Sequence, residues 1–151
     1  MHDKFSLPQT SWIALLSIAH RYDFLNVRER AMREVYGTPA TAQQHQQKDH
    51  LRLLSVAEKY DVPPERLLPS LIALVMRSQP LTEDEVALFS ALTMSRLAHA
   101  REEFVRATPD PRRMPPHPSL FLTQQLVQPR KEDIAKDIVY KIWQIPKDDL
   151  H

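Results

Sequence analysis

The sequence predicts an all-α protein built from antiparallel helical hairpins. Apolar residues recur at steps of three and four along most of the chain, which is the period of an amphipathic helix. The 151 residues include one glycine against thirteen prolines, a composition that disfavours the tight turns of β-sandwiches and barrels. A ten-residue helical segment also occurs twice, as LLSIAHRYDF at 15–24 and as LLSVAEKYDV at 53–62, with six identical positions. Reuse of one helical unit indicates paired helices that stack side by side.

The first half of the chain contains three expected helices. The first runs from residue 8 or 9 to 22, and the second runs to residue 36 with Asn26 as its expected N-cap. Gly37 stands where the second helix needs a residue in a left-handed conformation. The third helix runs from about 48 to 60 and ends before Pro63 and Pro64. The side chains expected to form the structural core of these helices are Trp12, Leu16, Ala19, Tyr22, Leu54, Ala57 and Tyr60.

Prolines and a capping signal divide the second half of the chain. A short helical turn at 65–68 precedes a helix at 70–77 that has Pro69 in its first turn, and a continuous helix kinked at Pro69 is the alternative. Thr82 and Glu85 have the spacing of a capping box. One long helix is therefore expected from 83 to about 106.

Three parts are expected along the chain: a helical domain at 7–106, a Pro-rich linker at 107–118 and a C-terminal tail at 119–151 with a helix near 131–143. The tail helix carries Tyr140 and Trp143, and exposed aromatic side chains often anchor protein partners. These two residues are the candidate partner-binding site. Docking of the tail on the core of the same chain is the alternative.

The repeated Ala-x-x-Tyr-Asp motif, at 19–23 and 57–61, has two interpretations. In the structural one, Ala allows close packing of helices, Tyr covers the helix end and Asp closes the following turn. In the functional one, the two copies form a pair of ligand pockets. The structural interpretation is favoured, because one duplicated helix end accounts for every residue of the motif.

No residue pattern indicates a catalytic, cofactor or metal site. The chain has no cysteine, which excludes disulfides, thiolate metal sites and a catalytic thiol. His45 and His50 with Asp49 form a weak metal trio, because metal-binding helices space their ligands by four residues rather than five. Ser17 and Ser55 lie inside amphipathic helices, without the strained turn that activates a serine nucleophile. We therefore expect no catalytic residue, no cofactor and no metal, and we expect that the protein is not an enzyme.

The charges of the chain nearly cancel, with 20 basic and 19 acidic residues and a formal net charge of +1. A nucleic-acid-binding domain gathers a basic excess on one face, so nucleic acid is a disfavoured partner. The first residues lack the apolar segment of a signal peptide, and the longest apolar run, at 71–76, is far shorter than the roughly 20 residues that span a membrane. We expect an intracellular protein, cytoplasmic or nuclear, with no membrane and no small-molecule substrate as partner.

A set of short motifs extends from residue 7 to residue 106. The first copy of the repeat lies within Leu7-Pro8 and Trp12-x-x-Leu15-Leu16-x-x-Ala19-x-x-Tyr22-x-Phe24-x-x-Val27-Arg28. The second lies within Leu54-x-x-Ala57-x-Lys59-Tyr60-Asp61-Val62-Pro63, followed by Leu67-Leu68-Pro69-Ser70, Leu74-Val75-x-Arg77, Pro80-Leu81-Thr82 and Ala98-His99-Ala100-Arg101-Glu102. In combination, these motifs resemble the BACK-like helical region that follows the BTB/POZ domain in proteins of mushroom-forming (basidiomycete) fungi. The resemblance covers two-thirds of the chain.

The resemblance implies an all-helical extension that positions a dimerising BTB domain or whatever that domain recruits. The BTB domain itself is absent, so its dimerisation and cullin-binding residues cannot be carried over. Either a truncated gene product or an extension that acts alone is expected. The expected function is a non-catalytic protein–protein interaction or scaffold module with an unknown protein partner and an undetermined oligomeric state. The alternative is a DNA-associated transcriptional regulator.

Overall fold

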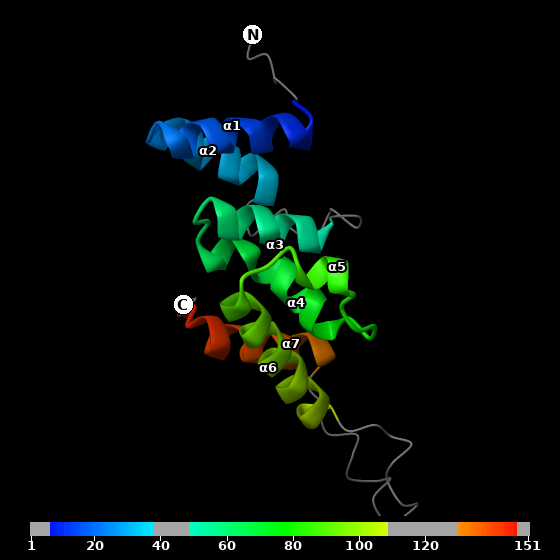
Figure 1. The fold of residues 1–151 in the computed structure, drawn as a ribbon. Helices are drawn as coiled ribbons and strands as arrows, with labels where there is room; N and C mark the ends of the chain where they lie inside the picture. The colour runs from blue at the N-terminus through cyan, green and yellow to red at the C-terminus, as the bar shows by residue number, and fades with distance from the viewer. Residues whose placement is uncertain (1–6, 38–48, 109–129, 148–151) are drawn as a thin grey trace, which may run out of the picture. The chain divides into compact units, whose positions relative to one another are not determined.

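The computed structural model describes residues 7–37, 49–108 and 130–147, and every regular element in these ranges is helical (Figure 1). The predicted all-α class is therefore confirmed. Contacts divide the chain into two compact units, residues 1–70 and 71–151, with the division inside the fourth α-helix. The helices in chain order are α1 (Gln9–Arg21), α2 (Leu25–Tyr36), α3 (His50–Lys59), the 3₁₀ helix η2 (Pro64–Leu67), α4 (Leu68–Met76), α5 (Glu83–Val86), α6 (Ala91–Ala107) and α7 (Lys131–Trp143).

The helix expected near 131–143 is present as α7. The predicted extent of a single domain, 7–106, stays a prediction. The predicted linker at 107–118 lies outside the described residues, apart from Ala107 at the end of α6 and Thr108 after it.

In the first unit, α1 and α2 form an antiparallel hairpin joined by residues 22–24 (Figure 1). The α1 residues that pack on α2 are those at the predicted helical spacing, and alanines on both helices allow the backbones to approach closely. Arg30 also places its guanidinium 5.8 Å from the centre of the Trp12 ring. The buried residues of the hairpin are Trp12, Leu16, Ala19, Ala31, Met32, Val35 and Tyr36.

Two side chains of α2 bind carbonyl oxygens of α3. The buried Tyr36 hydroxyl donates a hydrogen bond to the Leu53 carbonyl at 3.0 Å, and burial raises the pKa of Tyr36, so the phenol stays protonated as a donor. Arg28 donates from Nη2 to the carbonyls of Tyr60 and Asp61, both at 3.1 Å, at the end of α3. These carbonyls follow the last helical turn and have no intrahelical partner. Arg28 therefore caps a helix other than its own.

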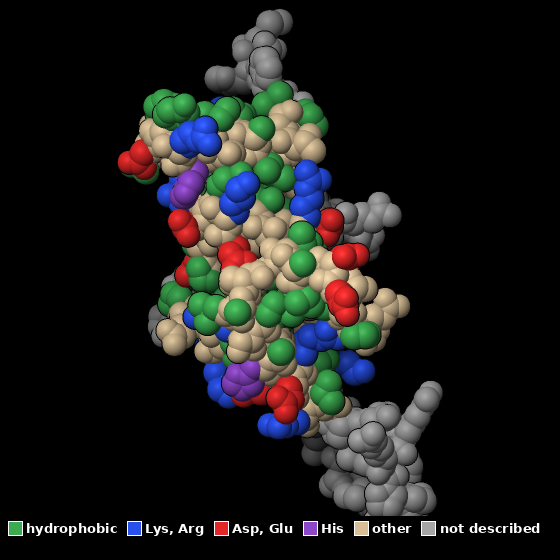
Figure 2. Space-filling model, in the orientation of Figure 1, with side chains coloured by type: hydrophobic (Ala, Val, Ile, Leu, Met, Phe, Trp, Pro, Cys, Tyr) green, Lys and Arg blue, Asp and Glu red, His purple; other side chains and the backbone are tan. Residues whose placement is uncertain are grey.

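The predicted core of the first unit is partly wrong. Trp12, Leu16, Ala19, Leu54 and Ala57 are buried as expected. Tyr22 is instead exposed, and hydrophobic side chains reach the surface of the α1–α2 pair in Figure 2. Tyr60 is half-buried, and its ring packs edge-on against the His20 ring, with ring centres 5.8 Å apart. Both tyrosines follow the last helical residue, so the helical period that places Ala19 and Ala57 no longer sets the direction of these side chains.

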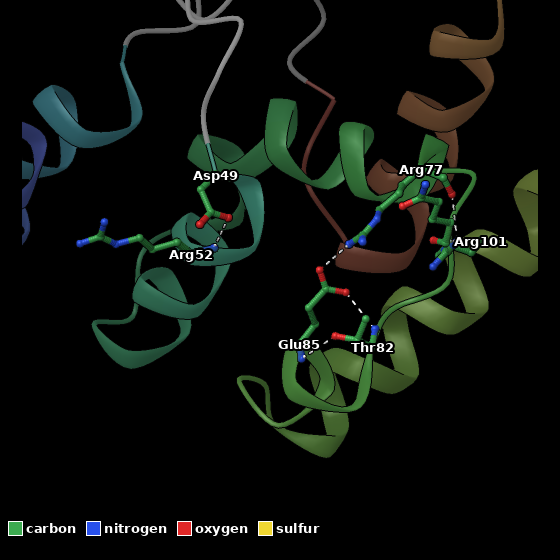
Figure 3. Close-up of polar contacts among 7 residues, drawn as sticks. Asp49, Arg52, Arg77, Thr82, Glu85 and Arg101 are labelled. Atoms are coloured by element: carbon green, nitrogen blue, oxygen red, sulfur yellow. Dashed lines mark hydrogen bonds and ion pairs between the residues drawn. The ribbon is translucent and has the colours of Figure 1, made fainter.

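The N-termini of α2 and α3 also differ from expectation. Helix α2 begins at Leu25, so Asn26 lies inside it, and no side chain caps its first turn. Helix α3 has an N-cap in Asp49, whose Oδ1 accepts a hydrogen bond from the Arg52 backbone N–H at 3.2 Å (Figure 3). Gly37 follows α2 as predicted, with φ 79° and ψ 176°, a backbone region that only glycine occupies readily.

In the second unit, the capping box is confirmed and the long helix is not. Thr82 Oγ1 accepts from the Glu85 N–H at 3.3 Å, and Glu85 Oε2 accepts from the Thr82 N–H at 2.9 Å (Figure 3). The helix from that box, α5, ends at Val86, and α6 starts after Ser90, which caps it by accepting from the Thr93 N–H. The predicted helix at 83–106 is therefore two helices, because a second N-cap interrupts an otherwise helical apolar pattern.

Arg101 of α6 repeats in the second unit what Arg28 does in the first. Its Nη2 donates to the carbonyls of Arg77 and Gln79, at 2.9 and 2.8 Å, just beyond the end of α4 (Figure 3). Arg77 in turn donates to Glu85 Oε1 at 3.0 Å. The Thr82 backbone N–H and then the Arg77 side chain lower the pKa of Glu85. The segment between α4 and α5 is thus fixed by charged side chains at both ends.

Helix α7 packs against α6 within the second unit. The buried face of α7 carries Ala135, Ile138 and Val139, followed by buried Ile145. Lys141 Nζ donates to both carboxylate oxygens of Glu103 on α6, at 2.9 and 3.2 Å, and His99 Nε2 lies 3.2 Å from the same carboxylate. This part of the tail is therefore docked on its own chain, the alternative left open by the sequence.

Replacing Arg28 tests the tertiary cap on α3. We expect Arg28→Met to lower the free energy of unfolding by about 1–2 kcal/mol, because it leaves two carbonyls without their charged donor while retaining the aliphatic stem. Urea denaturation of the full chain measures this loss. Arg33→Met is the matched control, since Arg33 is an exposed residue of the same helix whose side chain has no partner among the described residues. Equal stability of the two variants would contradict the capping role.

The α6–α7 contact is expected to weaken in acid. The hydrogen bond from Lys141 is the main cause that lowers the pKa of Glu103 below its ordinary value of 4.5 in the folded state. A carboxylate whose pKa is lower in the folded state than in the unfolded state stabilises the fold when the pH is above its ordinary pKa. This stabilisation is lost as the pH falls through the pKa of the folded state. The difference in melting temperature between the wild type and Glu103→Gln should therefore be largest at neutral pH and vanish in acid.

Glu102→Gln is the control for that pH series, because the exposed Glu102 forms its ion pair with Arg106 within α6. A smaller effect is expected for this variant at neutral pH. If Glu103→Gln changed the melting temperature no more than Glu102→Gln did, Glu103 would not be stabilising the α6–α7 contact.

Candidate functional site

The two copies of the repeated motif end α1 and α3 in the same way. Asp23 and Asp61 both have left-handed backbones, with φ 56° and 50°. Each allows the next N–H to reach back five residues along the helix: Phe24 donates to the Ala19 carbonyl at 2.9 Å, and Val62 donates to the Ala57 carbonyl at 3.0 Å. This is the long hydrogen bond of a Schellman helix end. Ala and Asp in both copies are thus accounted for by helix termination.

The two copies differ in what they expose. Val62 is buried, whereas its counterpart Phe24 is 54% exposed. Tyr60 lies against His20, but its counterpart Tyr22 is 61% exposed and stacks on Phe24, with ring centres 6.1 Å apart and planes 27° apart. The same type of helix end therefore exposes two aromatic rings to solvent in the first copy only.

These rings belong to a larger exposed apolar area, which we call the corner surface. Ile18 lies one helical turn before Tyr22, and Leu25 follows Phe24 at the start of α2. Hydrophobic side chains gather near the end of the hairpin where α1 joins α2 in Figure 2, with a basic and an acidic side chain beside them. Four large side chains expose on the order of 500 Å² there, an area typical of an interaction site rather than of scattered surface residues. The corner surface consists of Ile18 (50% exposed), Tyr22, Phe24 and Leu25 (64% exposed).

The rim of the corner surface carries one charge of each sign. Arg21 and Asp23 stand on either side of Tyr22 in the chain, and both are exposed. Neither side chain forms an ion pair or hydrogen bond with another residue that the structure describes. The surface is therefore apolar at its centre and electrically balanced at its edge.

The corner surface rests on a fixed support. The helix end below it is closed by the bond from the Phe24 N–H to the Ala19 carbonyl, and Arg28, one turn into α2, binds the end of α3. Glu29, the next residue of α2, forms an ion pair with Arg66 of η2. These contacts hold the first turn of α2 in place. The exposed rings are thus presented on a preformed backbone.

The aromatic pair predicted for partner binding lies elsewhere, on α7. Tyr140 and Trp143 are both half-buried. The Tyr140 ring has the ammonium groups of Lys136 and Lys147 at 5.9 and 5.8 Å from its centre. These cation–π contacts account for Tyr140 within its own unit. A partner-binding role for Tyr140 and Trp143 stays a prediction.

The residues described bring together little that could perform chemistry. Among residues 7–37, 49–108 and 130–147, no three His, Asp or Glu side chains lie close enough to hold a metal ion. His45 lies outside those ranges, while His50 Nδ1 lies 3.1 Å from Ser70 Oγ. Ser70 is buried at the start of α4, so this Ser–His pair links helices rather than facing solvent. Ser17 and Ser55 are half-buried in α1 and α3.

Sequence reasoning missed the corner surface because it treated Phe24 and Val62 as equivalent apolar residues of a repeat. A signal was present. The short connection between α1 and α2 contains or adjoins three large apolar residues, Tyr22, Phe24 and Leu25. In the second copy, Tyr60 and Val62 are followed by prolines. A join this short leaves few neighbours to cover such side chains.

In comparisons with known proteins, no family model, curated protein or solved structure matches the chain. Within the part of the chain that the structure describes, no helix has the length and apolar character needed to cross a membrane.

Glycine at the two left-handed positions tests the helix-end role of the repeat. We expect Asp23→Gly and Asp61→Gly each to raise the free energy of unfolding by about 0.5–1 kcal/mol, because glycine adopts positive φ without a steric penalty. Asp23→Val and Asp61→Val should lower it by about 1–2 kcal/mol. Thermal denaturation of the four variants provides the comparison. Destabilisation by glycine at either position would show that the carboxylate has another role there.

Proposed function

We propose that this chain is a non-catalytic protein-interaction module that binds a protein partner through the corner surface. The observation that carries the proposal is a preformed, exposed cluster of two stacked aromatic rings and two aliphatic side chains at a fixed helix end. Aromatic side chains dominate binding energies at protein interfaces, since each buries a large area with few rotatable bonds. Water is displaced from the corner surface when a partner covers it.

The resemblance to the helical region behind fungal BTB domains supports a scaffold role of the same kind. In this proposal, Trp12, Leu16 and Ala19 of the matching motif build the hairpin, and Tyr22 and Phe24 provide its binding face. The second copy of the motif supports the hairpin, because its end is where Arg28 binds. The module works inside the cell, in the cytoplasm or nucleus.

A non-enzymatic role is supported by the burial of the serine in the Ser70–His50 pair. A serine nucleophile needs access to substrate and a base that is itself oriented by a third group. Ser70 is only 5% exposed, so a substrate carbonyl has no route to its hydroxyl.

A DNA-associated regulator is the less favoured proposal. Several cations that could contact phosphate are engaged within the chain: Arg28 and Arg101 bind carbonyls, and Arg66 and Arg77 bind carboxylates. Lys, Arg, Asp and Glu side chains are interspersed on the face shown in Figure 2. Retention on duplex DNA with a steep salt dependence would favour this function over protein binding.

Site-specific photo-crosslinking in cells that naturally express the chain tests the proposed function. We expect a benzophenone amino acid at position 22 to form an adduct with a defined protein partner. The same residue at position 92 should form none, because Leu92 is equally exposed at 61% but lies on α6. The adduct from position 22 should be lost when Phe24→Ser is added and kept when Leu88→Ser is added, since Phe24 and Leu88 are 54% and 53% exposed.

Equal adducts from positions 22 and 92 would contradict the proposal, because they would indicate collisions rather than a specific surface. Absence of any adduct from position 22 would contradict it as well. Circular dichroism of each variant establishes that the helices are intact.

A further inference from the structure

Resting on the proposed function, we propose that the partner at the corner surface is a second copy of this chain. The two copies meet through a two-fold axis at the Tyr22–Phe24 pair. Arg21 of each copy then forms an ion pair with Asp23 of the other.

The rim is complementary to itself. A two-fold axis brings the same patch of both molecules face to face, so each charge at the rim meets whatever stands across the axis on the same patch. Arg21 and Asp23 flank Tyr22, both are exposed, and neither has a partner among the described residues. A patch that carries one exposed cation and one exposed anion can form two ion pairs with a second copy of itself, one from each copy's arginine. A rim of one sign would repel a second copy.

The centre of the patch is also suited to a symmetric contact. The Tyr22 and Phe24 rings are stacked at an interplanar angle of 27°, and both side chains are more than half exposed. Two such pairs can pack in the offset arrangement that aromatic rings prefer. Ile18, one turn before Tyr22, and Leu25, next to Phe24 in the chain, are exposed as well and would help to exclude water from the contact once a second copy covers them.

The size of the patch sets the strength of the contact. The corner surface offers on the order of 500 Å² per copy, compared with about 800 Å² per partner in a standard stable interface. The dimer is therefore weak, with a dissociation constant on the order of 10–100 μM, and it forms and separates readily. Self-association at high concentration is the property to measure.

The structure supports a charge-exchange experiment. Arg21→Asp gives a chain with two carboxylates at the rim, and Asp23→Arg gives a chain with two guanidinium groups. Each variant alone should dimerise at least tenfold more weakly than the wild type, because each homodimer faces like charges twice. An equimolar mixture should recover wild-type affinity, since both ion pairs form between the two different chains. Sedimentation equilibrium of the full-length chains from 5 to about 500 μM measures all four conditions.

The repeat supplies a matched control for strain at the left-handed position. Asp61→Arg places the same residue at the same backbone conformation in the second copy, where φ is 50° rather than 56°. It carries the same steric cost, retains the backbone carbonyl that accepts from Arg28 and changes a side chain outside the corner surface, so its dimerisation should equal that of the wild type. Circular dichroism during heating checks that each variant is folded at the temperature of the measurement.

A wild-type chain that stays monomeric up to the highest concentration would overturn the self-contact. So would single variants that dimerise like the wild type, or a mixture that fails to recover affinity. If the chain were monomeric while position 22 still crosslinked to a different protein, the proposed interaction module would stand and only the second copy would be excluded. If both measurements were negative, both proposals would be wrong.

Discussion

The structure depends on how helices end in a chain with a single glycine. Most helices that stop in a left-handed residue use glycine there, since other residues pay a steric cost. This chain uses Asp23, Asp61 and Gln144, each with φ between 50° and 56°, and each followed by an N–H that bonds to a carbonyl five residues earlier. Two arginines, Arg28 and Arg101, reach across from neighbouring helices to carbonyls at the ends of α3 and α4. Helix termination and tertiary packing are therefore carried by the same contacts, so a change at a helix end also affects how that helix is held.

That constraint determines where the protein can present a binding surface. A left-handed residue reverses the chain within three residues, so α2 starts at Leu25, directly after the three-residue connection from α1. At the end of α3 the chain continues into prolines and η2, and Val62 is covered. At the end of α1 it continues into another helix, and Tyr22 and Phe24 stay in solvent. The same left-handed helix end therefore has a structural role at the end of α3 and exposes two aromatic side chains at the end of α1.

The sequence was sufficient for the fold class and for most helix positions, because the apolar period and the prolines act locally. It failed at a second N-cap inside an apolar pattern, and where contacts between distant residues decided the outcome. The break between α5 and α6 depends on Ser90 acting as a cap inside a pattern that stays helical in period, and the caps provided by Arg28 and Arg101 join residues that are 22 to 33 positions apart. The exposure of Tyr22 likewise depended on which element follows it in the chain. Asp49, which the sequence offered as a weak metal ligand, is the N-cap of α3. The corner surface was hidden by the repeat itself, since likeness between the two copies concealed their different surroundings.

Residue-by-residue amide hydrogen exchange, followed by NMR, tests the central claim that non-glycine helix ends are firmly closed. We expect the N–H groups of Phe24, Val62 and Ile145 to exchange as slowly as those in the last turns of α1, α3 and α7, because each is bonded to the carbonyl five residues before it. The amides just after them should exchange faster. Exchange of all three at the rate of an unstructured chain would contradict the account, because the helix ends would then be frayed and the corner surface would have no fixed support.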